Sequence, residues 1–249
     1  MKVFVFEVGK IKVPDKDHLT AGRGGMPITI PVAAYLIEHP KGRVLVDTGM
    51  NPDVWPPELK QASMMRPEQK IDSQLLELGL EPEDIDYTIL THMHLDHAGG
   101  MTLFPSATFI VRKTELRFAW WPDRWLKGWV YEDYKDTRDY KYIQLDDVED
   151  FDLFMDGSIV CIDSKGHTPG HQSVLVDLPN SGKMLFAGDA VHTAENLYEA
   201  VMPGHGWNPD LMKKNMSHMR QMQANGVKVI LGHDPEFFKN LKLAPDYYD

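Results

Sequence analysis

The sequence predicts an α/β fold in which two β-sheets pack between helices. Two halves of the chain share one layout, in which short apolar strands run into polar loops and then into helices. The strand at 44–46 ends in Asp47, and the strand at 185–187 leads into Asp189 at the corresponding place. The repeat is weak by itself, but two sheets of similar construction explain it.

The first half alternates short apolar strands with two helices. We predict strands at residues 1–8, 31–39, 43–47, 87–90 and 108–111, and helices at 68–78 and 114–119. Residues 1–8 alternate apolar and polar side chains, as a half-buried strand does. The longer helix places four apolar side chains on one face, namely Ile71, Leu75, Leu76 and Leu78. Gly79 then follows as a typical helix stop.

The second half contains four short apolar segments separated by turn residues. We predict strands at 158–162, 173–177, 183–187 and 227–231. Residues 209–224 form a helix, with Asn208 as its N-cap. No Ser-, Gly- or Pro-rich linker divides the chain, so we predict a single domain over 1–249.

The segment 120–142 interrupts this pattern. It holds four of the six tryptophans together with several tyrosines and many charges. One interpretation is an irregular surface excursion anchored by its aromatic side chains. Another is a cap over a site or a contact in a homodimer, because long irregular insertions in compact domains are often functional.

Composition excludes several classes of protein. Of the 249 residues, 43% are hydrophobic and 25% charged, which is ordinary for a globular domain. The net charge of −11 argues against a nucleic-acid groove and against a polybasic membrane anchor. The single cysteine, Cys161, cannot form an internal disulfide. No apolar run reaches the length of a membrane span or a signal peptide, so we expect a cytoplasmic protein.

The sequence T-H-M-H-L-D-H at residues 91–97 points to metal chemistry. It places His92, His94, Asp96 and His97 within six positions. In an extended loop the first two histidines point the same way, and a turn toward a helix directs the last two residues elsewhere. One loop can therefore offer ligands to two adjacent metal ions. Imidazole and carboxylate suit zinc and its neighbours among the transition metals.

Three further candidates lie where strands run out into loops. His167 is in G-H-T-P-G-H, Asp189 is in A-G-D-A, and His233 is in L-G-H-D. Functional side chains of sheet proteins gather at such positions. A closed structural zinc site is the other interpretation, but such sites are four-coordinate and rich in cysteine, and this chain offers seven His and Asp candidates.

With these motifs in order over nearly the whole chain, the sequence resembles the metallo-β-lactamase superfamily. The resemblance implies an αββα sandwich of two mixed sheets with a dinuclear centre at one edge. It implies that His92, His94 and His167 hold one ion, that Asp96, His97 and His233 hold the other, and that Asp189 bridges them. It also implies that Asp47, in L-V-D-T-G, orients a ligand histidine.

Within that superfamily the chain looks most similar to N-acyl homoserine lactonases, which quench quorum signals. The similarity lies in the total length, in H-L-D-H-A-G-G and G-H-T-P-G-H-Q-S, and in the run from Asp189 to Asn196. These lactonases usually carry a tyrosine three residues after the bridging aspartate. His192 stands there in this sequence, and its ring can donate a similar hydrogen bond or indicate a different substrate.

The implied activity is hydrolysis of a carboxylic ester, the ring opening of a lactone. Two divalent ions lower the pKa of a shared water, and the bridging hydroxide attacks the lactone carbonyl. Zinc is the first choice, with iron, manganese and cobalt as alternatives. The predicted catalytic residues are Asp96, Asp189 and His192. The apolar residues predicted to hold an acyl tail are Met64, Met65, Trp120 and Trp121.

Other activities on the same site stay open. The alternatives are another small lactone, a phosphotriester or phosphodiester, and a thioester. A phosphate substrate favours additional Arg or Lys near the site, and the motif loops contain few. A redox role for iron generally needs a fused flavin domain, for which the chain has no room. A non-catalytic scaffold would have lost ligands, and none of the seven is missing.

Overall fold

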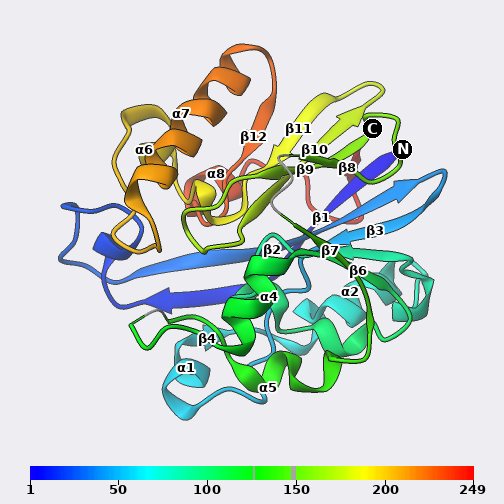
Figure 1. Ribbon diagram of the computed structural model, residues 1–249, viewed down its shortest axis with the longest axis horizontal. Helices are drawn as coiled ribbons and strands as arrows, with labels where there is room; N and C mark the ends of the chain where they lie inside the picture. Colours follow the sequence, from blue (N-terminus) through cyan, green and yellow to red (C-terminus); the bar gives the residue numbers. More distant parts are fainter. Residues whose placement is uncertain (126, 147–149) are drawn as a thin grey trace.

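The computed structural model describes residues 1–125, 127–146 and 150–249 (Figure 1). Within them, two mixed β-sheets lie face to face, and helices cover the outer side of each (Figure 1). This is the αββα sandwich that the sequence predicts.

The larger sheet has eight strands in the described part of the chain, in the order β13-β1-β2-β3-β5-β6-β7, with β4 paired to β1. Their bounds are β1 Lys2–Val13, β2 Ile28–His39, β3 Gly42–Val46, β4 Ser63–Met64, β5 Tyr87–Ile89, β6 Thr108–Arg112, β7 Lys141–Leu145 and β13 Tyr247–Tyr248. Strands β3, β5, β6 and β7 run parallel. The carboxyl ends of β3 and β5 therefore meet at one edge of the sheet.

The smaller sheet has five described strands in the order β12-β11-β10-β9-β8. Their bounds are β8 Asp150–Asp152, β9 Ile159–Asp163, β10 Gln172–Leu178, β11 Gly182–Phe186 and β12 Lys228–Ile230. Strands β11 and β12 are parallel, and the other pairs are antiparallel. The carboxyl ends of β11 and β12 thus also share one edge.

The helices divide between the two outer faces. The α-helices are α1 Pro57–Ala62, α2 Ile71–Glu77, α3 Leu95–Ala98, α4 Lys113–Trp120, α5 Tyr131–Tyr134, α6 Ala194–Glu199, α7 Pro209–Ala224 and α8 Pro235–Phe238. The 3-10 helices are Lys16–His18, Pro67–Gln69, Pro82–Asp84, Met101–Leu103, Lys135–Thr137 and Gly188–Ala190. Helices α6 and α7 cover the smaller sheet, and α2, α4 and α5 lie on the side of the larger sheet (Figure 1). None of the helices in the described ranges is long and apolar enough to cross a membrane.

Three apolar layers hold the sandwich together. The layer between the sheets contains Tyr35 of β2 stacked on Phe186 of β11, with ring centroids 4.0 Å apart. The layer under the larger sheet packs Phe109 against helices α2 and α4, and the layer under the smaller sheet includes Met216 and Met219 of α7. Each large side chain buried in this way contributes about 1.5–3 kcal/mol.

Two of the predicted boundaries are wrong for local reasons. Strand β1 continues to Val13, beyond the predicted end at residue 8. A bulge between Glu7 and Lys10 shifts the pairing register and interrupts the alternating pattern, so the sequence pattern ends before the strand does. Gly9 provides the positive φ of 114° at that bulge. The predicted helix 68–78 starts only at Ile71, because Lys70 is extended and separates it from the 3-10 turn at Pro67–Gln69.

The segment 120–142 is more regular than predicted. It includes the end of α4, all of α5 and the start of β7. The ring of Trp120 packs edge-on against Tyr131 and Tyr134, and the buried Tyr134 hydroxyl donates a hydrogen bond to the Ala119 carbonyl. These aromatic contacts tie the segment to α4. Leu126 lies outside the described residues.

Candidate metal centre and its pocket

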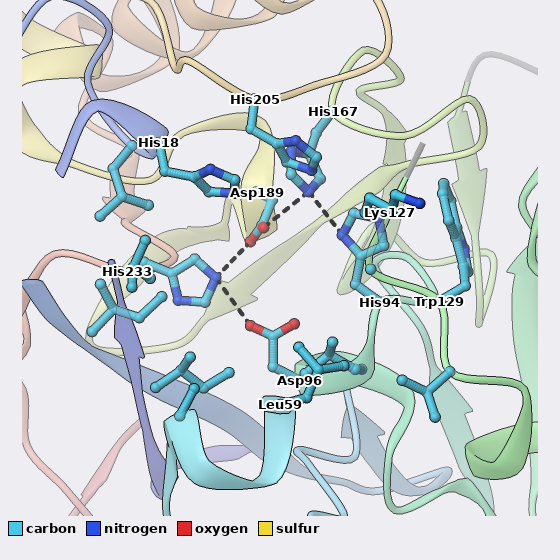
Figure 2. Close-up of a pocket in the computed structure, with 18 of the residues that line it drawn as sticks. His18, Leu59, His94, Asp96, Lys127, Trp129, His167, Asp189, His205 and His233 are labelled. Carbon is cyan, nitrogen blue, oxygen red and sulfur yellow. Dashed lines mark hydrogen bonds and ion pairs between the residues drawn. The ribbon is translucent and has the colours of Figure 1, made fainter. Parts of the chain in front are cut away.

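The predicted motifs converge because strand ends of both sheets meet at one edge of the sandwich. Asp47 follows β3, and the segment 91–97 follows β5 in the larger sheet. His167 lies in the loop between β9 and β10, Asp189 follows β11, and His233 follows β12 in the smaller sheet. Figure 2 shows side chains from these loops pointing into one pocket.

Seven buried side chains form two groups that each suit one metal ion. The first group contains His92, His94, His167 and Asp189, and the second contains Asp96, His97 and His233. Within each group, one ligand atom from every residue lies within 4.8 Å of the others. This division is the one that the family resemblance implies.

The carboxylate of Asp189 lies between the two groups. Its Oδ2 is 3.1 Å from His167 Nε2 and 3.8 Å from His92 Nε2. Its Oδ1 is 3.3 Å from His97 Nε2 and 3.1 Å from His233 Nε2 (Figure 2). One oxygen thus faces each group, as a bridging ligand requires.

The ring nitrogens of the two groups are available for metal ions. Nε2 of His92, His94 and His97 is buried and has no hydrogen-bond partner in the part of the chain that the structure describes. An unpartnered buried polar atom costs free energy, and several of them facing one space fit the binding of a metal ion. The donor set of imidazoles and carboxylates suits divalent transition metals, so the residues fit two such ions.

Burial and mutual proximity set the protonation of this cluster. Burial, followed by the neighbouring imidazoles, holds the pKa of His92 and His94 well below the ordinary value, so both are neutral and keep a free electron pair. Burial acts to raise the pKa of Asp189. The surrounding imidazoles, His233 first, outweigh this and hold the pKa well below its usual range. For His97 and His233 the neighbouring carboxylates, Asp96 first for His97 and Asp189 first for His233, outweigh burial and raise the pKa. The centre therefore presents an ionised carboxylate between neutral imidazoles in the first group and more readily protonated imidazoles in the second.

Asp47 contacts the candidate ligand His97 from a constrained backbone. Its φ of 58° is in the left-handed region, which a non-glycine residue rarely adopts. There Oδ2 lies 2.8 Å from His97 Nδ1 and accepts the hydroxyl of Thr91, while Oδ1 accepts the Thr91 amide at 2.7 Å. Fixing Nδ1 in this way directs Nε2 of His97 toward the metal centre.

Glu115 is a site residue that sequence analysis missed. Its fully buried carboxylate accepts hydrogen bonds from the Met93 amide, the Gly170 amide, the Thr168 hydroxyl and the Trp129 indole. These partners belong to the segment 91–97, the His167 loop and the pocket wall. One side chain of α4 therefore fixes three segments of the site, and nothing in the local sequence around residue 115 indicates this.

His171 contacts the backbone that carries Asp189. Its Nε2 accepts the backbone N–H of Asp189 at 3.0 Å. Its Nδ1 lies 2.8 Å from the hydroxyl of Ser164, which in turn contacts Ser173 at 2.8 Å. Burial holds the pKa of His171 well below the ordinary value, so the ring is neutral and can accept this hydrogen bond. The chain of contacts fixes the backbone that carries Asp189.

His192 lies beside the centre, where sequence analysis places a catalytic residue. Its side chain is buried, and Nε2 is 3.3 Å from Asp189 Oδ2. Nδ1 is buried and has no hydrogen-bond partner among the described residues. Burial lowers the pKa of His192 to about 4, so the ring is neutral at pH 7.

A cavity of about 730 Å³ opens above the metal-binding groups. Its apolar lining comes from β1, β2, α1, the loops that hold residues 19 and 55, and the segment 120–142. It includes Ile11, Val13, Leu19, Ile30, Trp55, Leu59, Ala62, Trp125, Trp129 and Val130. Three charged residues, Asp123, Arg124 and Lys127, line it as well. The cavity is large enough for a small lactone with an attached chain.

The four residues predicted to hold an acyl tail do not line this cavity. Met64 is in β4 and 54% exposed, and Trp121 is 88% exposed. Trp120 packs on two tyrosines, and Met65 lies at a separate small hollow with Met50. The prediction selected the right segments but the wrong side chains, because composition does not show which side of a loop faces the site.

Two pocket histidines, His18 and His205, were assigned no function from the sequence. Both line the cavity, and their rings stack with centroids 4.6 Å apart. Burial lowers the pKa of His205 to about 3 and, to a smaller extent, the pKa of His18. No spacing in the sequence relates them, since they come from opposite ends of the chain.

The comparisons of this chain with a family model and with known proteins agree on one family. Residues 28–233 match the family model described as the metallo-beta-lactamase superfamily. The chain is 31% identical to the N-acyl homoserine lactonase AttM of Azorhizobium caulinodans, over 100% of this chain and 99% of that protein. It is 28% identical to the N-acyl homoserine lactonase AiiA of Bacillus thuringiensis subsp. kurstaki, over 99% and 98% of the two chains.

Solved structures agree with this result. A quorum-quenching N-acyl homoserine lactone hydrolase superposes with a TM-score of 0.87 at 28% identity, covering 99% of this chain and 98% of that one. A second structure with the same values holds the product N-hexanoyl-L-homoserine at its catalytic metal center. The motifs, the αββα sandwich and the two metal-binding groups together show that this chain belongs to the metallo-β-lactamase superfamily.

Proposed function

We propose that this protein is a metal-dependent lactonase that opens the ring of N-acyl homoserine lactones. The observation that carries the proposal is the position of Asp189, whose two carboxylate oxygens face two buried metal-binding groups at the floor of a cavity. Full-length similarity to proteins named N-acyl homoserine lactonases supports the substrate class. The product seen at the metal center of a relative supports the reaction.

The protein's own residues hold the centre and position the substrate. His92, His94 and His167 would hold one divalent ion, Asp96, His97 and His233 the other, and Asp189 would bridge them. When bound, the ions supply Lewis acidity and an activated water. We propose zinc, because neutral imidazole with carboxylate is a donor set that it favours.

Two side chains would act directly on the reacting ester. The neutral ring of His192 can donate a hydrogen bond to the lactone carbonyl oxygen, which gains negative charge as the carbonyl is attacked. The ionised Asp189 would first accept the proton that the attacking water loses and then pass it to the alkoxide that leaves when the ring opens. Asp96 would act through the second group, because its Oδ2 is 3.6 Å from His233 Nε2.

Proton release in a pH-stat tests the proposal. Metal-loaded protein should open N-hexanoyl homoserine lactone, and a chelator should abolish this turnover. Asp189→Asn keeps the shape of the side chain but removes its charge, so metal content and turnover should both fall. No ring opening by protein with two ions bound, or full activity in Asp189→Asn, would overturn the proposal.

Hydrolysis of a phosphodiester is a second candidate. Arg124 and Lys127 line the cavity, although the motif loops themselves contain few cations. Cationic side chains favour an anionic substrate. Release of p-nitrophenol from bis-p-nitrophenyl phosphate, faster than lactone opening under the same conditions, would support this function over the lactonase. The cytoplasmic location, the single domain and the homodimer stay predictions.

A further inference from the structure

Two histidines outside both metal-binding groups form one wall of the cavity. His18 lies in the 3-10 helix Lys16–His18 after β1, and His205 lies in the loop between α6 and α7. Their rings stack nearly parallel, with an interplanar angle of 12°. Figure 2 shows His205 beside His167, and His18 on the same side of the cavity as Asp189.

The ring nitrogens of this pair are free to bind a ligand. Within residues 1–125, 127–146 and 150–249, His18 forms hydrogen bonds only through its backbone, and His205 has no hydrogen bond or ion pair. A neutral imidazole carries one N–H donor and one nitrogen acceptor. The stacked pair therefore presents both a donor and an acceptor to the cavity.

The loop that carries His18 is fixed in place. The ammonium of Lys16 lies 2.6 Å from a carboxylate oxygen of Glu195 in α6. The Gly204 amide donates to the His18 carbonyl at 3.1 Å, and the Asn196 side chain donates to the Leu19 carbonyl at 2.9 Å. These contacts join two segments distant in sequence and hold the pair in a defined position, which favours binding.

The pair lies at the right distance from the reaction centre to meet an amide. The His205 ring centroid is 5.4 Å from that of His167 and 6.0 Å from that of His94. In an N-acyl homoserine lactone, the amide nitrogen is bonded to the carbon next to the lactone carbonyl. With that carbonyl at the metal centre, the amide nitrogen lies only about 2.5 Å from the carbonyl carbon, because two covalent bonds separate them.

Few other uncharged polar groups of the cavity can serve an amide. The indole N–H of Trp55 donates to Asp133, and that of Trp129 donates to Glu115. The remaining lining is apolar, charged or part of the proposed catalytic centre, apart from the indole of Trp125, which is 63% exposed and can only donate. His18, which is exposed, and His205, which is partly buried, are therefore the uncharged partners available for the amide C=O and N–H.

We propose that His18 and His205 bind the amide of an N-acylated lactone and make the enzyme select amide-bearing lactones over plain alkyl lactones. One ring donates to the amide oxygen, and the other accepts the amide N–H. The proposal rests on the proposed lactonase function. It concerns selectivity between substrates and not the ring-opening step itself.

The test compares two lactones of similar chain length. The quantity measured is kcat/KM for N-hexanoyl homoserine lactone divided by kcat/KM for α-heptyl-γ-butyrolactone, which carries a chain of the same length at the same ring carbon but lacks the amide. His18→Phe and His205→Phe keep a stacked ring but remove its nitrogens, and each should lower this ratio about tenfold. His218→Phe, on the exposed face of α7, is the matched control and should leave the ratio unchanged.

A second pair of variants keeps the test independent of packing. His18→Gln and His205→Asn retain a donor and an acceptor, so they should recover much of the lost selectivity. Metal content and melting temperature are measured for every variant. An unchanged ratio in both Phe variants, or an equal loss on both lactones, would overturn the inference while leaving lactonase function intact. Failure of the unmodified protein to open either lactone would instead overturn the proposed function.

Discussion

At the scale of single residues, the site depends on side chains that hold other side chains. Asp47 adopts an unfavourable left-handed conformation, with φ of 58°, and from there reaches both Thr91 and His97. Such strain persists only where surrounding contacts determine it. The hydrogen bonds to the loop after β5 provide them.

We expect Asp47→Asn to weaken metal binding about 10–100-fold, the range typical for residues that orient a ligand. Asparagine tolerates a positive φ, but its amide cannot accept hydrogen bonds at both former oxygens. Competition with a chromophoric chelator measures the affinity. Asp139→Asn, at an exposed position, is the control and should bind as the unmodified protein does. Equal affinities of the two variants would contradict the role of Asp47.

His192 tests how the substrate carbonyl is stabilised. His192→Phe should lower kcat for lactone opening about a hundredfold, because a hydrogen-bond donor to the developing oxyanion is lost. His192→Tyr restores a hydrogen-bond donor, the phenol hydroxyl, at this position and should retain activity. Initial rates at saturating substrate, with metal content checked, distinguish the two. Complete loss in His192→Tyr would show that His192 has a different function.

At the scale of secondary-structure elements, short helices connect the pocket wall to the sheets. Glu115 of α4 joins the metal-binding loops to Trp129 through four hydrogen bonds. Asp133 of α5 holds a second tryptophan of the pocket wall: the indole Nε1 of Trp55 donates a hydrogen bond to Asp133 Oδ2 at 3.1 Å. Both carboxyls are buried. Burial raises the pKa of each carboxyl, whereas the hydrogen bonds that it accepts lower that pKa.

Asp133 should make stability depend on pH. Burial raises its pKa from 3.8 to about 8. Between these values the folded state binds a proton that the unfolded state has lost, so the free energy of unfolding falls as pH rises. Asp133→Asn cannot ionise and still accepts the Trp55 hydrogen bond. Its melting temperature should decline less than that of the unmodified protein between pH 5 and pH 8.

Thermal unfolding at a series of pH values measures this difference. Asp136→Asn, a neighbouring exposed position, is the control and should follow the unmodified protein. Parallel curves for Asp133→Asn and the unmodified protein would show that Asp133 titrates normally.

At the scale of the whole molecule, the metal centre lies where the two sheets meet. The candidate ligands come from loops of both sheets, so bound ions would tie the halves of the sandwich together. Without ions, the uncompensated polar atoms in this region are a cost to the folded state.

Removal of metal should therefore lower the melting temperature as well as activity. A ligand that binds only the folded state stabilises it by mass action, by about 2.7 kcal/mol at a hundred times its Kd. Calorimetry of chelator-treated protein, before and after adding zinc back, measures the effect. Restoration of activity without any rise in melting temperature would contradict a role of the ions in joining the sheets.

The sequence by itself predicted the sandwich, the seven candidate ligands and Asp47. These features are local: a strand ends, a loop follows, and chemically distinctive residues stand at fixed spacing, as at His92 and His94. The short helix α5 and the edge strands β8 and β13 were not predicted, because tertiary packing and not local pattern stabilises elements of two to four residues.

Only the tertiary structure decided which side chains line the cavity. His18 and His205 are far apart along the chain, and they stack because backbone hydrogen bonds dock one loop on the other. Glu115 looks like an ordinary helical residue until the fold buries its carboxylate among four donors. Met64 and Trp121 looked suitable by composition, but the backbone turns them outward. Periodicity and spacing predict the conformation of residues that are close in sequence. A pocket wall consists of residues from distant segments, which come together only when the two sheets pack.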